Sequence, residues 1–147
     1  MEIQSLKVSL TDADVAGLAA EHMPANDSIE GLQVRLTPEG VLLQGQYATG
    51  FGFKVPFETV WQLTASGPRI DVKLDTIKVA GLPGGMLRTV LMRMIRDNAE
   101  TQAGISVVEE TIQIDVPAVA KSHGADVRVN FTAVRMSVGS AVVEAGA

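Results

Sequence analysis

Alternation of apolar and polar residues between positions 29 and 79 constrains the fold more than any other feature of this sequence. Four consecutive stretches show it, at 29–37, 41–49, 51–63 and 70–79. Turn-forming residues separate them, as at Pro38-Glu39-Gly40, and the alternation slips once, between Leu74 and Ile77. A period of two is typical of half-buried strands, and short turns join antiparallel neighbours. The sequence therefore predicts a curved antiparallel meander in its middle.

A helical period replaces this alternation after the break at Gly81-Leu82-Pro83-Gly84-Gly85. Residues 86–103 form a predicted helix whose apolar positions, at about 100° per residue, cover roughly half of its circumference. This face is wider than one packing stripe requires, so we expect the sheet to wrap around the helix. A shorter helix is predicted at 12–23, because Thr11 is a favourable N-cap and Pro24 ends the pattern.

The ends of the chain add further short elements to this framework. They are a strand at 3–10, strands at 105–108 and 111–116, a short helix at 117–123, and a final hairpin or long bent strand from 127 to 138. The chain of 147 residues carries no internal repeat and no low-complexity tract. Its length matches one globular unit, so we expect a single domain over residues 1–147.

Composition excludes several classes of protein. Hydrophobic residues make up 46% and charged residues 20%, which argues against intrinsic disorder. The net charge of −5 argues against nucleic-acid binding, and the absence of cysteine excludes disulfides and thiolate catalysis. No charge-free stretch approaches the roughly 20 apolar residues of a membrane span, although transient membrane contact stays open.

The first residues of the chain show no basic segment followed by an apolar one. This pattern predicts a cytoplasmic protein for the chain as given, with export as the alternative if a signal peptide has been removed.

Catalytic and metal-binding patterns are missing from the sequence. The two histidines, His22 and His123, each fall at the end of a predicted helix, where a packed or dipole-stabilising histidine is the usual interpretation. Glu109 and Glu110 are neighbours and point apart if they lie on a strand, which suits no acid/base pair. We therefore expect no enzymatic activity, no catalytic residues, no metal site and no cofactor.

Two clusters of side chains remain as candidates for a binding site. The first joins apolar residues of the predicted strands and of the long helix: Phe51, Phe53, Phe57, Trp61, Met86, Val90, Leu91, Met94 and Ile95. These residues form either an ordinary core or the walls of an apolar cavity in which adaptable methionines contact acyl chains. The second cluster comprises Arg88, Arg93 and Arg96, which form either a solvated helix face or a contact for a phosphate or carboxylate head group.

The order of these elements resembles a known family. A capped helix is followed by "GVLLQGQY", "VPFETVWQL", "RIDVKLDTIKVAGLPGG", the long helix and "TIQIDVPAVAKSHGADVRV". Over residues 5–143 this resembles the bacterial TULIP-like lipid-binding domains, in particular the unknown-function family that includes the lipomannan elongation assistant. The resemblance implies an α+β fold in which a strongly curved antiparallel sheet wraps around a long amphipathic helix, beside a shorter N-terminal helix, with an elongated apolar cavity between sheet and helix.

The expected function is non-enzymatic binding or carriage of a lipid or a similar apolar small molecule. The first cluster would line the cavity, and the arginines would contact the head group. The alternative is a structural or interaction module with a filled core, which could form a homodimer through exposed sheet edges or the residual helix face.

Overall fold

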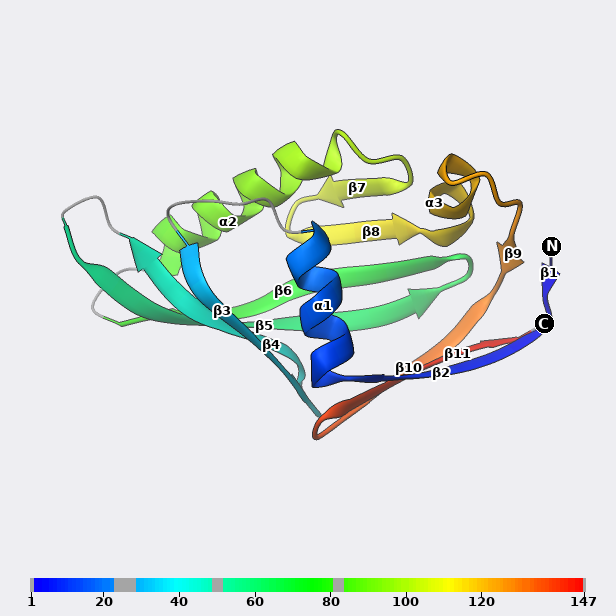
Figure 1. Ribbon diagram of the computed structural model, residues 1–147, viewed down its shortest axis with the longest axis horizontal. Coiled ribbons are helices and arrows are strands. Elements are labelled where there is room, and N and C mark those ends of the chain that lie inside the picture. Colours follow the sequence, from blue (N-terminus) through cyan, green and yellow to red (C-terminus); the bar gives the residue numbers. More distant parts are fainter. Residues whose placement is uncertain (1, 23–28, 49–51, 81–83, 147) are drawn as a thin grey trace.

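The computed structural model describes residues 2–22, 29–48, 52–80 and 84–146, except for the side chains of residues 19–22, 84 and 86. Its elements are β1 (Glu2–Ile3), β2 (Ser5–Thr11), α1 (Asp12–His22), β3 (Ile29–Thr37), β4 (Gly40–Ala48), β5 (Lys54–Ser66), β6 (Arg69–Val79), α2 (Gly84–Ala99), β7 (Ile105–Val108), β8 (Thr111–Asp115), α3 (Val116–Ser122), β9 (Arg128–Val129), β10 (Phe131–Ser137) and β11 (Ser140–Gly146). Figure 1 shows their arrangement.

Two antiparallel sheets and one short parallel pair make up the β-structure. The larger sheet has six strands in the order β3-β4-β5-β6-β8-β7, and the smaller has three in the order β10-β11-β2. Strands β1 and β9 pair in parallel over two residues each. The antiparallel pairing of the predicted meander is confirmed over β3 to β6, with a register shift between Val60 and Trp61, whereas its predicted curvature is wrong.

The predicted fold class is wrong. Strands make up more than half of the described residues, the three described helices are short, and the sheets stay open. The predicted long helix ends at Ala99 and lies against one face of the six-stranded sheet, so no strongly curled sheet wraps around it (Figure 1). Antiparallel pairing and a single small unit agree with the sequence-based expectation.

Packing of α2 against the six-stranded sheet forms the core. Leu87 and Leu91, each 1% exposed, pack on Phe57. A second group of buried residues joins Met92 of α2 to the sheet residues Leu43, Trp61 and Leu74. Burial of side chains of this size stabilises a fold by about 1.5–3 kcal/mol each, so these contacts hold α2 in place.

A buried polar residue in this core has its hydrogen bonds satisfied. Thr59 is fully buried. Its Oγ1 accepts a hydrogen bond from the indole nitrogen of Trp61 at 2.9 Å and donates one to the carbonyl oxygen of Leu43 at 3.2 Å. Because the Thr59 hydroxyl both donates and accepts a hydrogen bond, its burial costs the core little.

Helix α1 begins with the cap that the sequence predicts. The Asp14 backbone nitrogen donates to Thr11 Oγ1 at 3.3 Å, and the Thr11 nitrogen donates to Asp14 Oδ2 at 2.9 Å. The backbone nitrogen of Leu36 on β3 also donates to Asp12 Oδ1 at 2.7 Å. The first turn of α1 is thus closed on itself and attached to the edge of the larger sheet.

Candidate functional site

Four of the predicted apolar residues take part in the contact between α2 and the larger sheet. Phe57 and Trp61, 3% and 5% exposed, lie on β5 beneath α2. Leu91 packs in the cluster of Phe57, and Ile95 packs against the cluster of Trp61. That these four residues line a ligand-binding cavity stays a prediction. In the structure they form the contact between α2 and the sheet.

The other predicted apolar residues lie apart from this contact. Phe53 is 54% exposed, and Val90 and Met94 are half-buried on α2. Phe51 and the side chain of Met86 lie outside the described residues. The packed face of α2 also includes Leu87, Met92 and Ala99, which were not among the predicted lining residues.

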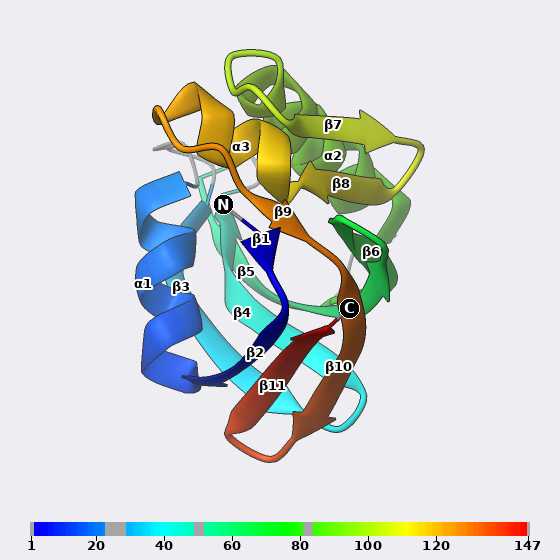
Figure 2. The same ribbon diagram turned by 90° about the vertical axis from the view of Figure 1, so that its right-hand side faces the viewer.

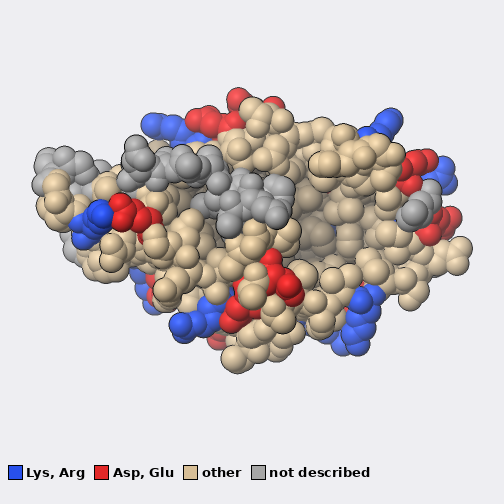
Figure 3. Space-filling view, viewed as in Figure 1, with Lys and Arg blue, Asp and Glu red and all other residues tan. Residues whose placement is uncertain are grey.

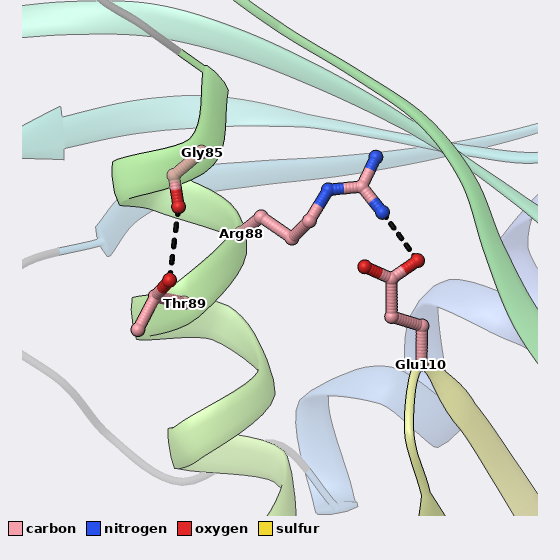
Figure 4. A network of polar contacts seen from close by, with 4 residues as sticks. All are labelled: Gly85, Arg88, Thr89 and Glu110. Atoms are coloured by element: carbon pink, nitrogen blue, oxygen red, sulfur yellow. Dashed lines mark hydrogen bonds and ion pairs between the residues drawn. The ribbon is translucent and has the colours of Figure 1, made fainter.

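The three predicted head-group arginines do not form one cluster around a cavity. Arg88 forms an ion pair with Glu110, in the turn between β7 and β8 (Figure 4). Arg93 and Arg96 are exposed on α2. Because Glu110 already neutralises Arg88, this guanidinium supports the position of α2 against the β7–β8 turn.

The histidines fit the structural interpretation where they are described. His123 is exposed at the end of α3, and its Nδ1 lies 2.9 Å from the carbonyl oxygen of Val119. The side chain of His22 lies outside the described residues. Among the residues with described positions, no group of three or more His, Asp or Glu side chains could hold a metal ion.

The three-stranded sheet carries an apolar face that the sequence analysis did not assign to a site. Its register places nine side chains on this face: Leu6, Val8, Leu10, Phe131, Val134, Met136, Ala141, Val143 and Ala145. The two alanines of this set are buried, and its seven larger residues are half-buried. The face is therefore apolar in composition but incompletely covered.

A second apolar wall lies on the larger sheet, beyond the end of α2. It consists of half-buried side chains near the far ends of β5, β6 and β8: Leu63, Ala65, Ile70 and Ile114. The two walls meet where β10 passes β5, because Gly67 and Phe131 form an antiparallel bridge and the Phe131 nitrogen donates to the Gly67 oxygen at 2.6 Å. Bridge partners share a face, so both walls lie on one side of this junction.

The space between these walls is a hollow in the molecular surface. Figure 3 shows it to the right of α1, and comparison with Figure 1 places the far halves of β5 and β6 behind it, β8 above it and β2 below it. Seen from the right-hand end, α1, the small sheet and β8 surround the same region (Figure 2). We call it the inter-sheet hollow.

Charged side chains of the small sheet point away from the inter-sheet hollow. Lys7, Arg135 and Glu144 occupy the opposite face in the register, and Arg135 pairs with Glu144 at 3.5 Å. On the inner face of this sheet, as far as the structure describes it, every side chain is apolar. Such a wall can contribute dispersion and hydrophobic contact, and it offers no side chain for acid/base chemistry.

A polar groove lies elsewhere, on the face of the larger sheet opposite α2. Its volume is about 570 Å³, and a row of paired residues, Gln33, Gln44, Glu58 and Lys78, crosses it over four strands. The amide nitrogen of Gln44 donates to Glu58 Oε1 at 3.1 Å. A row of hydrogen-bonded polar residues is typical of the solvated face of an antiparallel sheet.

Comparison with models of protein families, with curated proteins and with solved structures finds no match to this chain. The resemblance to TULIP-like domains therefore stays a prediction, and its implied fold is the part that the structure overturns. No helix within the described ranges is long and apolar enough to cross a membrane.

Proposed function

We propose that this protein binds a lipid or another apolar small molecule without catalysing a reaction, and that the ligand occupies the inter-sheet hollow. One observation carries the proposal: two apolar walls meet at a junction and leave their larger side chains half-buried. Monomeric proteins rarely leave contiguous apolar surface of this kind uncovered unless it serves binding.

The energetics favour an acyl chain or a similar flexible apolar group. Burial contributes about 0.8 kcal/mol per methylene, so about ten methylenes match the middle of the 4–15 kcal/mol cost of association. Half-buried side chains such as Leu6, Val8 and Leu63 would gain further burial from the same ligand. A ligand held in this way needs no charged partner inside the hollow.

Paired tryptophan variants on β2 test this proposal. Val8 lies on the apolar face and its neighbour Ser9 on the opposite face, so Val8→Trp fills the hollow while Ser9→Trp adds the same indole outside it. With a dansyl-labelled fatty acid as the probe, we expect Val8→Trp to weaken binding by at least about tenfold, the equivalent of roughly 1.4 kcal/mol. Ser9→Trp should bind like the unmodified chain.

Native mass spectrometry of the purified protein provides the independent measurement. A co-purifying lipid, lost in Val8→Trp and kept in Ser9→Trp, is the expected result. Absence of any bound lipid together with absence of probe binding would contradict the proposal. Equal weakening by both variants would also contradict it, because the effect would then not depend on the hollow.

A further inference from the structure

A groove separates the two sheets along part of the line where they approach each other. On one side lies β5, which pairs with β4 only as far as Val41 and Trp61, so that residues 62–66 have no partner strand on that side. On the other side lies β10, the outer strand of the smaller sheet. Two strand edges therefore face each other, and β5 and β10 approach closely along this line.

The groove is closed at both ends by backbone hydrogen bonds. At one end the Phe131 nitrogen donates to the Gly67 oxygen at 2.6 Å, and at the other the Gly139 nitrogen donates to the Leu36 oxygen at 2.9 Å. The hairpin of β10 and β11 is thus fixed to the larger sheet at two points. An opening of about 260 Å³ remains between them, lined by residues of the β3–β4 turn, of β5 and of β10. We call this opening the seam groove.

The inner part of the seam groove is shared with the inter-sheet hollow. Its apolar lining residues are Leu63 on β5 and Val134 and Met136 on β10, all of them half-buried. Leu63 also belongs to the wall of the hollow on the larger sheet, and the two residues of β10 belong to the wall on the smaller sheet. Because the same side chains line both spaces, a ligand in the hollow can reach the surface through the seam groove.

The outer part of the seam groove is polar. It is formed by Glu39 in the β3–β4 turn and by Gln62 and Thr64 on β5, and all three residues are exposed. Strand edges without a partner add backbone N–H and C=O groups to this set. The outer part therefore offers both donors and acceptors of hydrogen bonds, with the Glu39 carboxylate as an acceptor only.

None of the residues that line the seam groove, all of which the structure describes, is basic. Lys73 pairs in the register with Gln62, but it lies on β6, on the side of β5 away from β10. Arg135 lies on the face of the small sheet opposite the hollow, where its guanidinium is 3.5 Å from the carboxylate of Glu144. An anionic group in the seam groove would therefore meet the charge of Glu39 without a cation among the lining residues.

We propose that the seam groove holds the polar end of a ligand whose apolar chain occupies the inter-sheet hollow, and that this head group is uncharged and bears hydroxyl groups, as in a monoacylglycerol. This inference rests on the proposed function and names the class of its ligand. A hydroxyl group donates to the Glu39 carboxylate and accepts from the Gln62 amide or from a strand-edge N–H. A fatty-acid carboxylate only accepts hydrogen bonds, and Glu39 repels it.

Two ligands with the same acyl chain test the head group. They are monolauroylglycerol and laurate, measured by isothermal titration calorimetry below their critical micelle concentrations. Laurate is ionised at about pH 8, because this pH lies far above the ordinary pKa of a carboxyl group. We expect the unmodified protein to bind monolauroylglycerol at least about tenfold more tightly than laurate, since laurate loses hydrogen bonds and gains repulsion.

Charge reversal tests the role of Glu39. Glu39 and Glu100 are both exposed, and Glu100 follows the end of α2, outside the groove lining, so Glu39→Lys and Glu100→Lys change the net charge equally at different places. In Glu39→Lys we expect the preference for monolauroylglycerol to fall by at least about tenfold, because attraction of laurate replaces repulsion. In Glu100→Lys the preference should stay within about twofold, since salt at about 0.15 M screens distant charges.

Protection of introduced cysteines locates the bound head group, and the absence of native cysteine makes the reaction specific. Thr64→Cys places a thiol in the seam groove, whereas Ser9→Cys places one on the face of β2 opposite the hollow. Both positions are exposed. Saturating monolauroylglycerol should slow the modification of Thr64→Cys by a charged maleimide and leave that of Ser9→Cys unchanged.

Contrary results would overturn separate parts of this inference. Laurate bound as tightly as monolauroylglycerol would overturn the uncharged head group. Equal shifts in Glu39→Lys and Glu100→Lys would overturn the role of Glu39. Unprotected Thr64→Cys, with monolauroylglycerol bound, would overturn the place of the head group in the seam groove. If neither ligand binds, the proposed function itself fails, which separates this result from the other three.

Discussion

Among the glycines that the structure describes, Gly40 is the position at which the fold tolerates a side chain least. It begins β4 with a φ of 141°, and a Cβ atom there would lie 2.2 Å from the carbonyl oxygen of Trp61. The contact is with backbone, which cannot rotate away as a side chain can. Glycine at this position therefore allows the β3–β4 turn to approach the centre of β5, where Trp61 and Thr59 form the polar contact of the core.

Substitution of Gly40 by alanine should cost far more stability than the same change at Gly139. Both glycines have positive φ, but a Cβ atom at Gly139 would meet no atom within 4 Å. Backbone strain of about 1–3 kcal/mol applies to both variants, and only Gly40→Ala adds a backbone clash. We expect urea denaturation to give the larger loss for Gly40→Ala. Equal losses would show that the positive φ alone, and not the clash with the Trp61 backbone, determines the loss of stability.

At the scale of elements, α2 is the helix with the most buried residues among the side chains that the structure describes. Leu91 is 1% exposed and packs with Leu87 on Phe57, whereas Val90, the adjacent residue, is half-buried at the side of this contact. The helix therefore presents one stripe to the sheet, and the flanking positions contribute less.

Leu91→Ala should destabilise the protein by about 2–5 kcal/mol, because the cavity left beneath α2 adds to the loss of apolar burial. Val90→Ala removes atoms from the half-buried flank and should cost less than half as much. Urea denaturation of the two variants measures the difference. A loss at Val90 as large as that at Leu91 would mean that α2 is enclosed on its flank as well, as the sequence analysis expected.

The elements show why the sequence predicted the strands better than their assembly. Alternation identified β3 to β6, and N-cap chemistry placed the start of α1, because both signals are local. The apolar face of α2 was also recognised, but its covered fraction depends on which strands come near it, and that is a tertiary property. The predicted wrapping of this helix was wrong for this reason.

The sequence analysis did not predict the inter-sheet hollow, because the hollow depends on pairing between strands that are far apart in the sequence. Apolar alternation in β2 was visible, but the strand that completes its sheet, β11, was not predicted: its adjacent Val142 and Val143 obscure the period. Pairing of β2 with β11, more than a hundred residues later, decides what Val8 faces. A local pattern could indicate an apolar face but not the opposite wall.

At the scale of the whole molecule, the clusters of buried residues lie on one side of the hollow. The two clusters of buried residues both lie beneath α2, and neither includes a residue of the small sheet. The part of the chain that the structure describes thus combines a filled core under α2 with a hollow beside α1.

This division predicts that added volume is tolerated on both faces of β2. In an empty hollow, the indole of Val8→Trp finds room, and we expect its free energy of unfolding to stay within about 1 kcal/mol of that of Ser9→Trp. In a filled core, the same indole would displace its neighbours and cost about 1–3 kcal/mol. Urea denaturation without ligand measures this difference.

Saturation with palmitate should then give the two variants different free energies of unfolding. A ligand at 100 times its Kd stabilises the folded state by about 2.7 kcal/mol, provided that it does not bind the unfolded chain. We expect this gain in Ser9→Trp and its loss in Val8→Trp, whose indole occupies the space of the acyl chain. A destabilised Val8→Trp, with no palmitate effect on Ser9→Trp, would instead indicate that the two sheets close on each other and that the protein is an interaction module with a filled core.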